Sequence, residues 1–235
     1  GKMTEPIEIF NYLNKYFDLL NKNKKLKVLI TAGPTIETID PVRFISNRSS
    51  GKQGYEIAKA FMNNGYDTTL ISGPTNLEPP RNVKLIKINS ADQMFEQTIN
   101  SLPVDVAIFS AAVSDFKVDK ISKNKIKKTD SVSLRMIKNK DILDYVSKHN
   151  SLRPKLVIGF SAETENIEAN SLSKLNEKNC DWIIANDVSN DQIGFGSDYN
   201  EVSIFFREKK MEKISKLKKS LLANEIVKKV NLELN

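Results

Sequence analysis

A long polar loop near the start of the chain carries residue types suited to binding an anion. The loop follows an apolar run at 26–32 and leads into a helical pattern that begins near residue 51. Its last part, Asn47-Arg-Ser-Ser-Gly-Lys52, combines an amide, a guanidinium, two hydroxyls and an ammonium group. Helix N-termini also offer unpaired backbone N–H groups and the positive end of the helix dipole. The segment therefore predicts a binding site for an anion.

The length of this loop favours a functional role. From Gly33 to Ser50 it far exceeds the usual strand-to-helix connection of about 2–6 residues, and long loops in compact domains are usually functional or disordered. Five apolar residues lead us to expect burial and order: Ile36, Ile39, Val42, Phe44 and Ile45. The alternative is an ordinary surface loop with a good helix cap.

The elements that position the loop alternate between strands and helices. Short apolar runs rich in β-branched residues predict strands at 26–32, 66–72, 83–88, 104–110, 155–161 and 181–186. Helical spacing predicts helices at 51–64, 91–101, 140–149 and 166–179. This βαβ order predicts an α/β fold, a Rossmann-like and mostly parallel sheet with helices on both faces.

The two ends of the chain depart from this alternation. Apolar spacing predicts a helix at 7–22, and we expect 1–25 to be a lead-in helix and junction segment. Residues 26–235 are expected to form a single domain. The C-terminal part predicts an antiparallel extension, with strands at 201–206 and 210–214, followed by a helix at 216–232. A further strand is predicted at 132–136.

Polar and small residues follow the ends of several predicted strands. They are Gly33-Pro-Thr35, Gly73-Pro-Thr75, Ala111-Ala-Val-Ser-Asp115, Ser161-Ala-Glu163 and Asn186-Asp187. In an open parallel sheet, ligands bind beyond the carboxyl ends of the strands, where such loops converge. We therefore expect these segments to meet along one edge of the sheet.

Composition limits the function classes. The chain of 235 residues has 36 Lys and Arg against 29 Asp and Glu, but no basic stripe interleaved with aromatic residues predicts nucleic acid binding. No window approaches the roughly 20 apolar residues of a membrane span. One cysteine, Cys180, is typical of a reducing compartment, so a cytoplasmic protein is expected. The only histidine, His149, is expected at the surface, which argues against zinc sites and catalytic triads.

Two common nucleotide motifs are incomplete. The dinucleotide fingerprint Gly-x-Gly-x-x-Gly would follow the first strand, but only Gly33 is present there. The Walker loop requires a glycine where this chain has Ser46, and a hydroxyl residue where it has Gln53. A nicotinamide-dependent oxidoreductase is still the main rival, because it shares the fold class. A nucleotide site here would use a different arrangement.

Seven ordered blocks resemble the phosphopantothenate–cysteine ligase (phosphopantothenoylcysteine synthetase) family. They lie at 31–35, 39–54, 110–116, 125–128, 159–164, 185–188 and 194–200, and the resemblance spans 26–230. It implies a ligase of coenzyme A biosynthesis that joins phosphopantothenate to L-cysteine. A nucleoside triphosphate, CTP in most bacteria and ATP in eukaryotes, converts the carboxylate to an acyl-nucleotide and releases pyrophosphate. The cysteine amine then attacks the acyl carbon. Magnesium accompanies the triphosphate.

The resemblance also implies roles for individual residues. Asn47, Arg43 and Lys125 match the positions that serve formation and turnover of the acyl-nucleotide, and an amide with a guanidinium suits a developing oxyanion. Lys125 opens a lysine-rich loop that is expected to close over the triphosphate. The implied nucleotide-binding positions are Gly33, Ser49, Ser50, Gly51, Ala111, Ala112, Asp115, Lys140, Asp141, Ile142, Leu143, Phe160, Lys174 and Lys178. Family members often carry proline where this chain has Lys140. The sequence does not assign the ligands of the metal ion.

The first residues add a point about context. Gly1-Lys-Met-Thr-Glu-Pro6 resembles the junction of bifunctional bacterial proteins in which a flavin-dependent decarboxylase domain precedes the synthetase. The chain is either an excised C-terminal half or a separate synthetase. The resemblance implies a homodimer. A non-catalytic nucleotide sensor is the third class of function that the sequence leaves open.

Overall fold

The computed structural model describes residues 4–23, 26–187, 196–208 and 211–234. In chain order the helices are α1 (Pro6–Asn23), α2 (Lys52–Asn63), α3 (Ala91–Asn100), α4 (Ile142–Ser147), α5 (Ile167–Lys178) and α6 (Lys219–Glu233). The strands are β1 (Lys27–Ala32), β2 (Ile36–Thr38), β3 (Phe44–Ser46), β4 (Asp67–Ser72), β5 (Lys84–Lys87), β6 (Val106–Phe109), β7 (Phe116–Val118), β8 (Met136–Lys138), β9 (Leu156–Glu163), β10 (Trp182–Asp187), β11 (Tyr199–Phe206) and β12 (Glu212–Lys218). Each element of the central βαβ pattern lies within a few residues of its predicted bounds.

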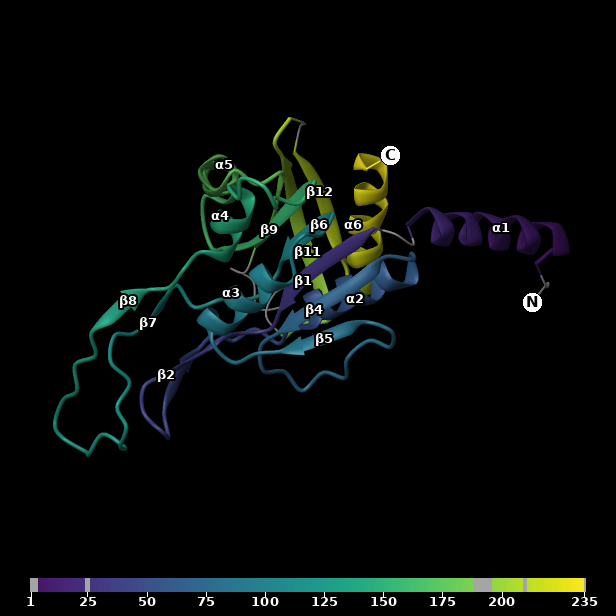
Figure 1. Cartoon of the computed structure of the whole chain (residues 1–235). Coiled ribbons are helices and arrows are strands. Elements are labelled where there is room, and N and C mark those ends of the chain that lie inside the picture. Colours follow the sequence, from purple (N-terminus) through teal and green to yellow (C-terminus); the bar gives the residue numbers. More distant parts are fainter. Residues whose placement is uncertain (1–3, 24–25, 188–195, 209–210, 235) are drawn as a thin grey trace.

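One eight-stranded sheet forms the centre of the molecule, in the order β12-β11-β10-β9-β6-β1-β4-β5 (Figure 1). The strands from β5 to β10 run parallel, while β11 and β12 add an antiparallel edge. The predicted α/β fold with a C-terminal antiparallel extension is therefore confirmed. The extension is shifted along the chain, because β12 continues to Lys218 and the last helix begins only at Lys219.

Helices cover both faces of the sheet because its central strands are apolar on both sides. Val28 and Ile30 of β1 pack in one core with α2 and α6, while Leu29 between them packs in the second core with α3, α4 and α5. This alternation follows from the two-residue period of a strand. Within the described ranges, no helix is long and apolar enough to cross a bilayer.

Two small hairpins project from the sheet as an arm. β2 pairs with β3 and β7 pairs with β8, each antiparallel, and the segment at 119–135 extends between the last two strands (Figure 1). The strand predicted at 132–136 is wrong, since the pairing begins only at Met136. The predicted burial of Val42 and Phe44 is also wrong, because their hairpin stands away from the sheet and they are 60% and 57% exposed.

Candidate active site

A cleft of about 570 Å³ lies beyond the carboxyl ends of the parallel strands. Its lining comes from the loop before α2, the residues after β6, the ends of β9 and β10, and the start of α6. Loops that are distant in the sequence therefore meet at one edge of the sheet, as predicted. The isolated bridge between Pro34 and Ala112 and the hydrogen bond from Ala112 N to Gly33 O (2.9 Å) hold two of these loops together.

The loop before α2 approaches the first strand's turn very closely. Gly51 has a φ of 76°, and a Cβ atom placed there would lie 3.3 Å from the Cα of Gly33. Ser49 Oγ accepts a hydrogen bond from Gly51 N (3.3 Å), and Ser50 Oγ accepts one from Lys52 N (3.5 Å). The two serines thus shape the loop, while the N-cap residue of α2, Gly51, has no side chain with which to cap the helix. That helix end is left facing the cleft.

A second, more apolar pocket of about 250 Å³ adjoins the cleft. The two share Ala111, Val113, Asp115, Phe160 and Lys174 in their linings. The remaining lining of the pocket includes the segment 138–143 and Lys178. The pocket thus gathers Phe160 and residues 140–143, which the resemblance implies for the nucleotide base, and Lys174 and Lys178, which it implies for the phosphates. The structure therefore brings the implied nucleotide-binding residues into two connected spaces, with the exception of Gly33, which lines neither.

Ion pairs fix the polar wall of this pocket. Lys178 Nζ lies 2.9 Å from a carboxylate oxygen of Asp141, which raises the pKa of Lys178. Asp141 also caps α4, since its carboxylate accepts a hydrogen bond from Asp144 N (2.9 Å). Lys174 Nζ donates to Glu163 Oε1 (2.5 Å). Both lysines keep their ammonium groups at the pocket, where they can meet phosphate oxygens.

Asn47 lies in the cleft and is oriented by the backbone. Its Nδ2 donates a hydrogen bond to the carbonyl oxygen of Ala112 (2.9 Å), which also accepts from Thr35 N (3.2 Å). This contact joins the polar loop to the residues after β6. The Asn47 amide is therefore held against the backbone of the segment that follows β6.

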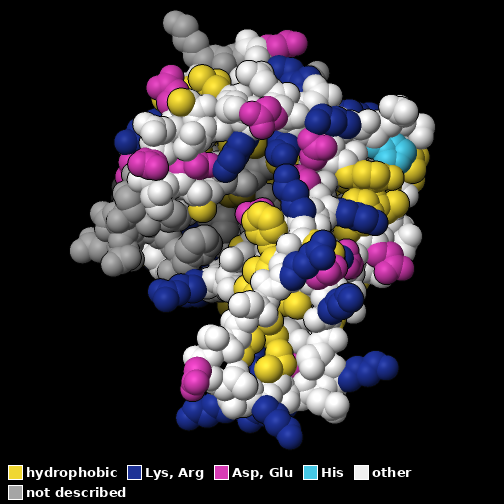
Figure 2. Space-filling view, turned by 90° about the vertical axis from the view of Figure 1, so that its left-hand side faces the viewer, with side chains coloured by type: hydrophobic (Ala, Val, Ile, Leu, Met, Phe, Trp, Pro, Cys, Tyr) yellow, Lys and Arg dark blue, Asp and Glu magenta, His cyan; other side chains and the backbone are white. Residues whose placement is uncertain are grey.

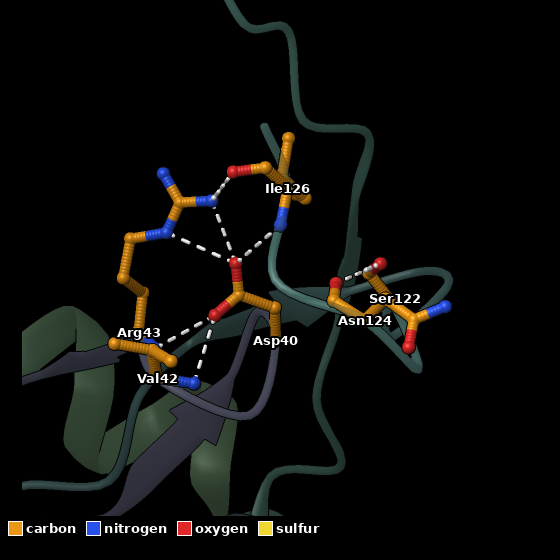
Figure 3. A network of polar contacts seen from close by, with 6 residues as sticks. All are labelled: Asp40, Val42, Arg43, Ser122, Asn124 and Ile126. Atoms are coloured by element: carbon orange, nitrogen blue, oxygen red, sulfur yellow. Dashed lines mark hydrogen bonds and ion pairs between the residues drawn. The ribbon is translucent and has the colours of Figure 1, made fainter. Parts of the chain in front are cut away.

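Arg43 makes a different set of contacts on the arm. Its Nε and one terminal nitrogen donate to Asp40 Oδ2 (3.0 and 2.6 Å), and the same nitrogen donates to Ile126 O (3.2 Å) (Figure 3). Asp40 is buried, and its carboxylate also accepts from the backbone N–H groups of Val42, Arg43 and Ile126. The Arg43 guanidinium and these N–H groups hold the pKa of Asp40 far below its usual range. The network ties the β2–β3 hairpin to the lysine-rich segment.

The three predicted catalytic residues do not converge within one chain. Asn47 lines the main cleft, whereas Arg43 and Lys125 line a separate surface hollow of about 430 Å³ on the arm. Figure 2 shows the arm as the narrow lower projection, with basic side chains around its tip. In this structure the Asp40 network holds the lysine-rich loop against the β2–β3 hairpin, and closure of that loop over a nucleotide stays a prediction.

Sequence reasoning missed several residues of the cleft. Asn200 of β11 and Lys219 of α6 line it and are 2% and 6% exposed. Asn200 Nδ2 donates to Gln53 Oε1 (3.3 Å), so the C-terminal elements contact the start of α2. Ser161 and Asn186 line the same cleft at the ends of β9 and β10, as their strand-end positions predict. Both Ser161 Oγ and Asn186 Oδ1 are buried without a hydrogen-bond partner among the described residues.

Other candidates have structural roles. The imidazole of His149 is half-buried, and its Nδ1 accepts from the backbone N–H groups of Ser151 and Leu152 (3.3 and 3.1 Å). Cys180 is fully buried, and burial raises the pKa of its thiol to about 12. Across the described part of the chain, no three His, Cys, Asp or Glu side chains cluster as metal ligands. Among the residues that the structure describes, Asp115 is the only acidic one in the lining of the main cleft.

Comparison with known proteins identifies the family. A family model described as the DNA/pantothenate metabolism flavoprotein C-terminal domain matches residues 23–233. The chain belongs to this family. The coenzyme A biosynthesis bifunctional protein CoaBC of Haemophilus influenzae is 43% identical over 234 residues, which are 97% of this chain. The protein of the same name from Bacillus subtilis is 36% identical over 235 residues. The chain spans 58% and 57% of the length of these two relatives.

Solved structures agree with the family assignment. A crystal structure of the C-terminal domain of the coenzyme A biosynthesis bifunctional protein CoaBC has a TM-score of 0.77 and 36% identity, covering 91% of this chain and 98% of that one. A Cab2 mutant in complex with phosphopantothenate-cysteine has a TM-score of 0.72 at 18% identity, covering 97% and 94%, and this likeness shows the shared fold alone.

Proposed function

We propose that the chain is a phosphopantothenate–cysteine ligase that uses CTP. Membership of the family and the CoaBC relatives support the ligase activity. The observation that carries the proposal is the continuity of the base pocket and the main cleft through Ala111, Asp115, Phe160 and Lys174. A nucleotide with its base against Phe160 directs its phosphates into the cleft, where a second substrate has room.

The proposed reaction has two bond-forming steps, and the residues of the cleft serve them in different ways. A carboxylate oxygen of phosphopantothenate attacks the α-phosphorus of CTP, and the bond to the leaving pyrophosphate breaks. The cysteine amine then forms a bond to the acyl carbon, CMP leaves, and the amine gives up a proton. The Asn47 amide, held by Ala112 O, stabilises the oxyanion that forms on the acyl group. Lys174 and Lys178 bind the phosphates.

Magnesium fits this cleft as a companion of the phosphates. Magnesium favours carboxylate and phosphate oxygens and usually keeps few protein ligands. Asp115 is an acidic side chain in the lining of the main cleft, so it would hold the ion together with the triphosphate. The ion would supply charge neutralisation for the departing pyrophosphate.

The same proposal includes a homodimer in which the arm of one subunit reaches the cleft of the other. Arg43 and Lys125 lie away from Asn47 in their own chain, so a second subunit would bring them to it. Exposed apolar side chains also concentrate on the arm, which is typical of a protein interface. They are Val42, Phe44, Phe116, Ile121, Val132, Leu134 and Met136.

Pyrophosphate release tests the activity. The protein is incubated with phosphopantothenate, cysteine, magnesium and either CTP or ATP, and pyrophosphate and the amide product are measured. Amide formed with CTP and one equivalent of pyrophosphate supports the proposal. Nucleotide binding without pyrophosphate would instead indicate a sensor, and product with ATP alone would overturn the assignment of CTP.

Mixed dimers test the shared site. Asn47→Asp and Lys125→Ala are each expected to lose most of their activity alone. If each cleft takes its arm from the partner, a mixture of the two variants contains dimers with one complete site and regains activity. Activity that stays at the level of the separate variants would show that each chain serves its own cleft.

A further inference from the structure

Asn139 lies where the arm joins the 250 Å³ pocket. It follows β8, the last strand of the arm, and comes shortly before α4 (Figure 1). Its side chain lines this pocket and does not line the main cleft. The positions that the resemblance implies for nucleotide binding begin one residue later, at Lys140, and do not include Asn139. Asn139 is therefore an unassigned polar residue at the part of the site proposed for the nucleotide base.

The backbone at the root of the arm fixes the amide of Asn139. The backbone N–H of Asn139 donates to Asp115 O (2.8 Å), and its Nδ2 donates to Ser114 O (2.8 Å). If the amide were reversed, Oδ1 would face the carbonyl oxygen of Ser114, and two acceptors would be in contact. The bond to Ser114 therefore decides that the remaining atom of the amide is an acceptor.

This acceptor lacks a hydrogen bond. Asn139 is 9% exposed, and its Oδ1 is buried with no hydrogen-bond partner among the described residues. A buried polar atom without a partner is costly, so each one in a native structure calls for an explanation. The terminal torsion of asparagine is broad, so a small rotation can turn Oδ1 toward the pocket while Nδ2 stays near Ser114 O. A donor on a bound ligand would then complete the amide.

Three lysines in the lining of the pocket are engaged with other groups. Lys174 and Lys178 form ion pairs with carboxylates, at 2.5 and 2.9 Å. The Nζ of Lys140 lies over the ring of Phe95, 4.6 Å from its centre, where the ring attracts the charge. Their ammonium groups therefore do not serve as donors to Asn139 Oδ1 in this structure.

We propose that Asn139 is a specificity-determining residue whose Oδ1 accepts a hydrogen bond from the 4-amino group of cytosine. The inference rests on the proposed function, which places the base of CTP in this pocket. The amino group carries the hydrogen that Oδ1 lacks, whereas uracil has a carbonyl oxygen at the same ring position. UTP would bring a second acceptor against Oδ1 and leave both oxygens without a hydrogen bond. Asn139 thus selects CTP against UTP. Adenine also has an amino group, so ATP is not the informative comparison.

Calorimetry with three nucleotides tests the inference on the wild-type protein. They are CTP, UTP and the triphosphate of pyrimidin-2-one riboside, which is CTP without its 4-amino group. CTP is expected to bind about tenfold more tightly than this deamino analogue, the effect of one hydrogen bond, and UTP is expected to bind most weakly. Equal affinities for CTP and the deamino analogue, or no binding of any of the three, would overturn the inference.

Two substitutions separate the acceptor from the bond that holds it. Asn139→Leu and Asn139→Asp both lose the donor to Ser114 O, but only aspartate keeps an acceptor oxygen. The leucine variant should bind CTP about as weakly as the wild type binds the deamino analogue, and its affinity for the analogue should be unchanged. The aspartate variant should still prefer CTP. Equal weakening of both nucleotides in Asn139→Leu, or no preference in Asn139→Asp, would show a purely structural role and overturn the inference.

Asn100→Leu is the matched control, because Asn100 is exposed at the end of α3. It should bind all three nucleotides as the wild type does, and equal losses in Asn100→Leu and Asn139→Leu would count against the inference. Circular dichroism checks folding, and if Asn139→Leu does not fold, Asn139→Asp and the wild-type comparison still decide.

Amide formation is measured separately from binding. A protein that selects CTP through Asn139 but forms no amide would uphold this inference and refute the ligase proposal. An active ligase that binds CTP and the deamino analogue equally would do the reverse.

Discussion

The predicted role of Asn47 depends on one donor atom, its side-chain nitrogen Nδ2. Its Nδ2 donates to Ala112 O, and an aspartate at this position would place two oxygens against that carbonyl. Asn47→Asp should keep the fold and slow turnover of the acyl-nucleotide by about 100-fold, the usual cost of losing one oxyanion donor. Rapid-quench measurement of acyl-nucleotide decay on addition of cysteine checks this. Asn76→Asp, at an exposed position, is the control, and equal decay rates in all three proteins would contradict the role.

The burial of Cys180 predicts that its thiol is unreactive in the folded protein. It is the only cysteine, it is fully buried, and burial raises its pKa to about 12. At pH 8 such a thiol is thiolate in only about one molecule in ten thousand, and the thiolate is the reactive form. A chromogenic disulfide reagent should therefore leave the native protein unmodified and titrate one thiol in denaturant. Rapid modification of the native protein would show that the strand start at Cys180 opens.

Some residues of the cleft can be predicted from the sequence, and others cannot. Asn47 and Phe160 could be found because they lie in recognisable blocks, after β3 and within β9. Lys219 could not be found, because Lys216, Lys218 and Lys219 look alike in a lysine-rich stretch. Only the packing of α6 against α2 buries one of them, and that contact depends on residues far away in the sequence.

At the scale of elements, the arm depends on the Asp40 carboxylate. Asp40→Asn removes its charge and replaces one acceptor oxygen by a donor, so the β2–β3 hairpin should separate from the lysine-rich segment. Hydrogen exchange of residues 116–138 should become faster, while exchange in the central strands stays unchanged. Asp130→Asn makes the same change at an exposed position of the arm and serves as the control. Unchanged exchange in Asp40→Asn would show that other contacts hold the arm.

The pKa of Asp40 sets the pH range of this contact. Its folded pKa is lower than its unfolded value, so the stabilisation is complete above the unfolded pKa and is lost only as the pH falls through the folded one. The contact should therefore persist through about pH 4, where ordinary aspartates take up protons. Hydrogen exchange of the arm measured from pH 7 to pH 4, corrected for the intrinsic rate, checks this, and a loss of protection near pH 5 would contradict it.

The arm was also the hardest element to predict. Val132 and Leu134 alternate with polar residues as in a strand, yet they are exposed and the pairing begins at Met136. The strands β2, β3 and β7 have three residues each, which is too short for a periodic signal. The longer apolar strands of the sheet were predicted closely, because burial on both faces leaves an unambiguous run.

For the whole molecule, the proposed dimer predicts a mass near twice that of one chain. Phe44→Ser on the arm should shift the protein toward the monomer and reduce ligase activity, since it removes an exposed apolar contact. Light scattering coupled to gel filtration measures both species. Leu232→Ser is the control, because Leu232 is 81% exposed on α6, away from the arm. A wild-type protein that is monomeric at assay concentration would refute the dimer.

The overall architecture was predictable because each level of the sequence pointed to the same fold. Apolar runs, helical spacing and strand-end loops all indicate a parallel sheet with its ligands at one edge. The division of the chain at residue 25 stays a prediction. The relation between the arm and the cleft could not be predicted, since it depends on the direction in which two short hairpins leave the sheet.

Lys52 and Lys219 line the same cleft from distant parts of the sequence, which has a consequence for how the protein is synthesised. The two residues lie at the starts of α2 and α6, with most of the chain between them. The sheet up to β10 can pair as the chain leaves the ribosome, but this end of the cleft cannot exist until α6 has been translated. A nascent chain would therefore lack the complete wall of the cleft until the residues of α6 had joined those of α2.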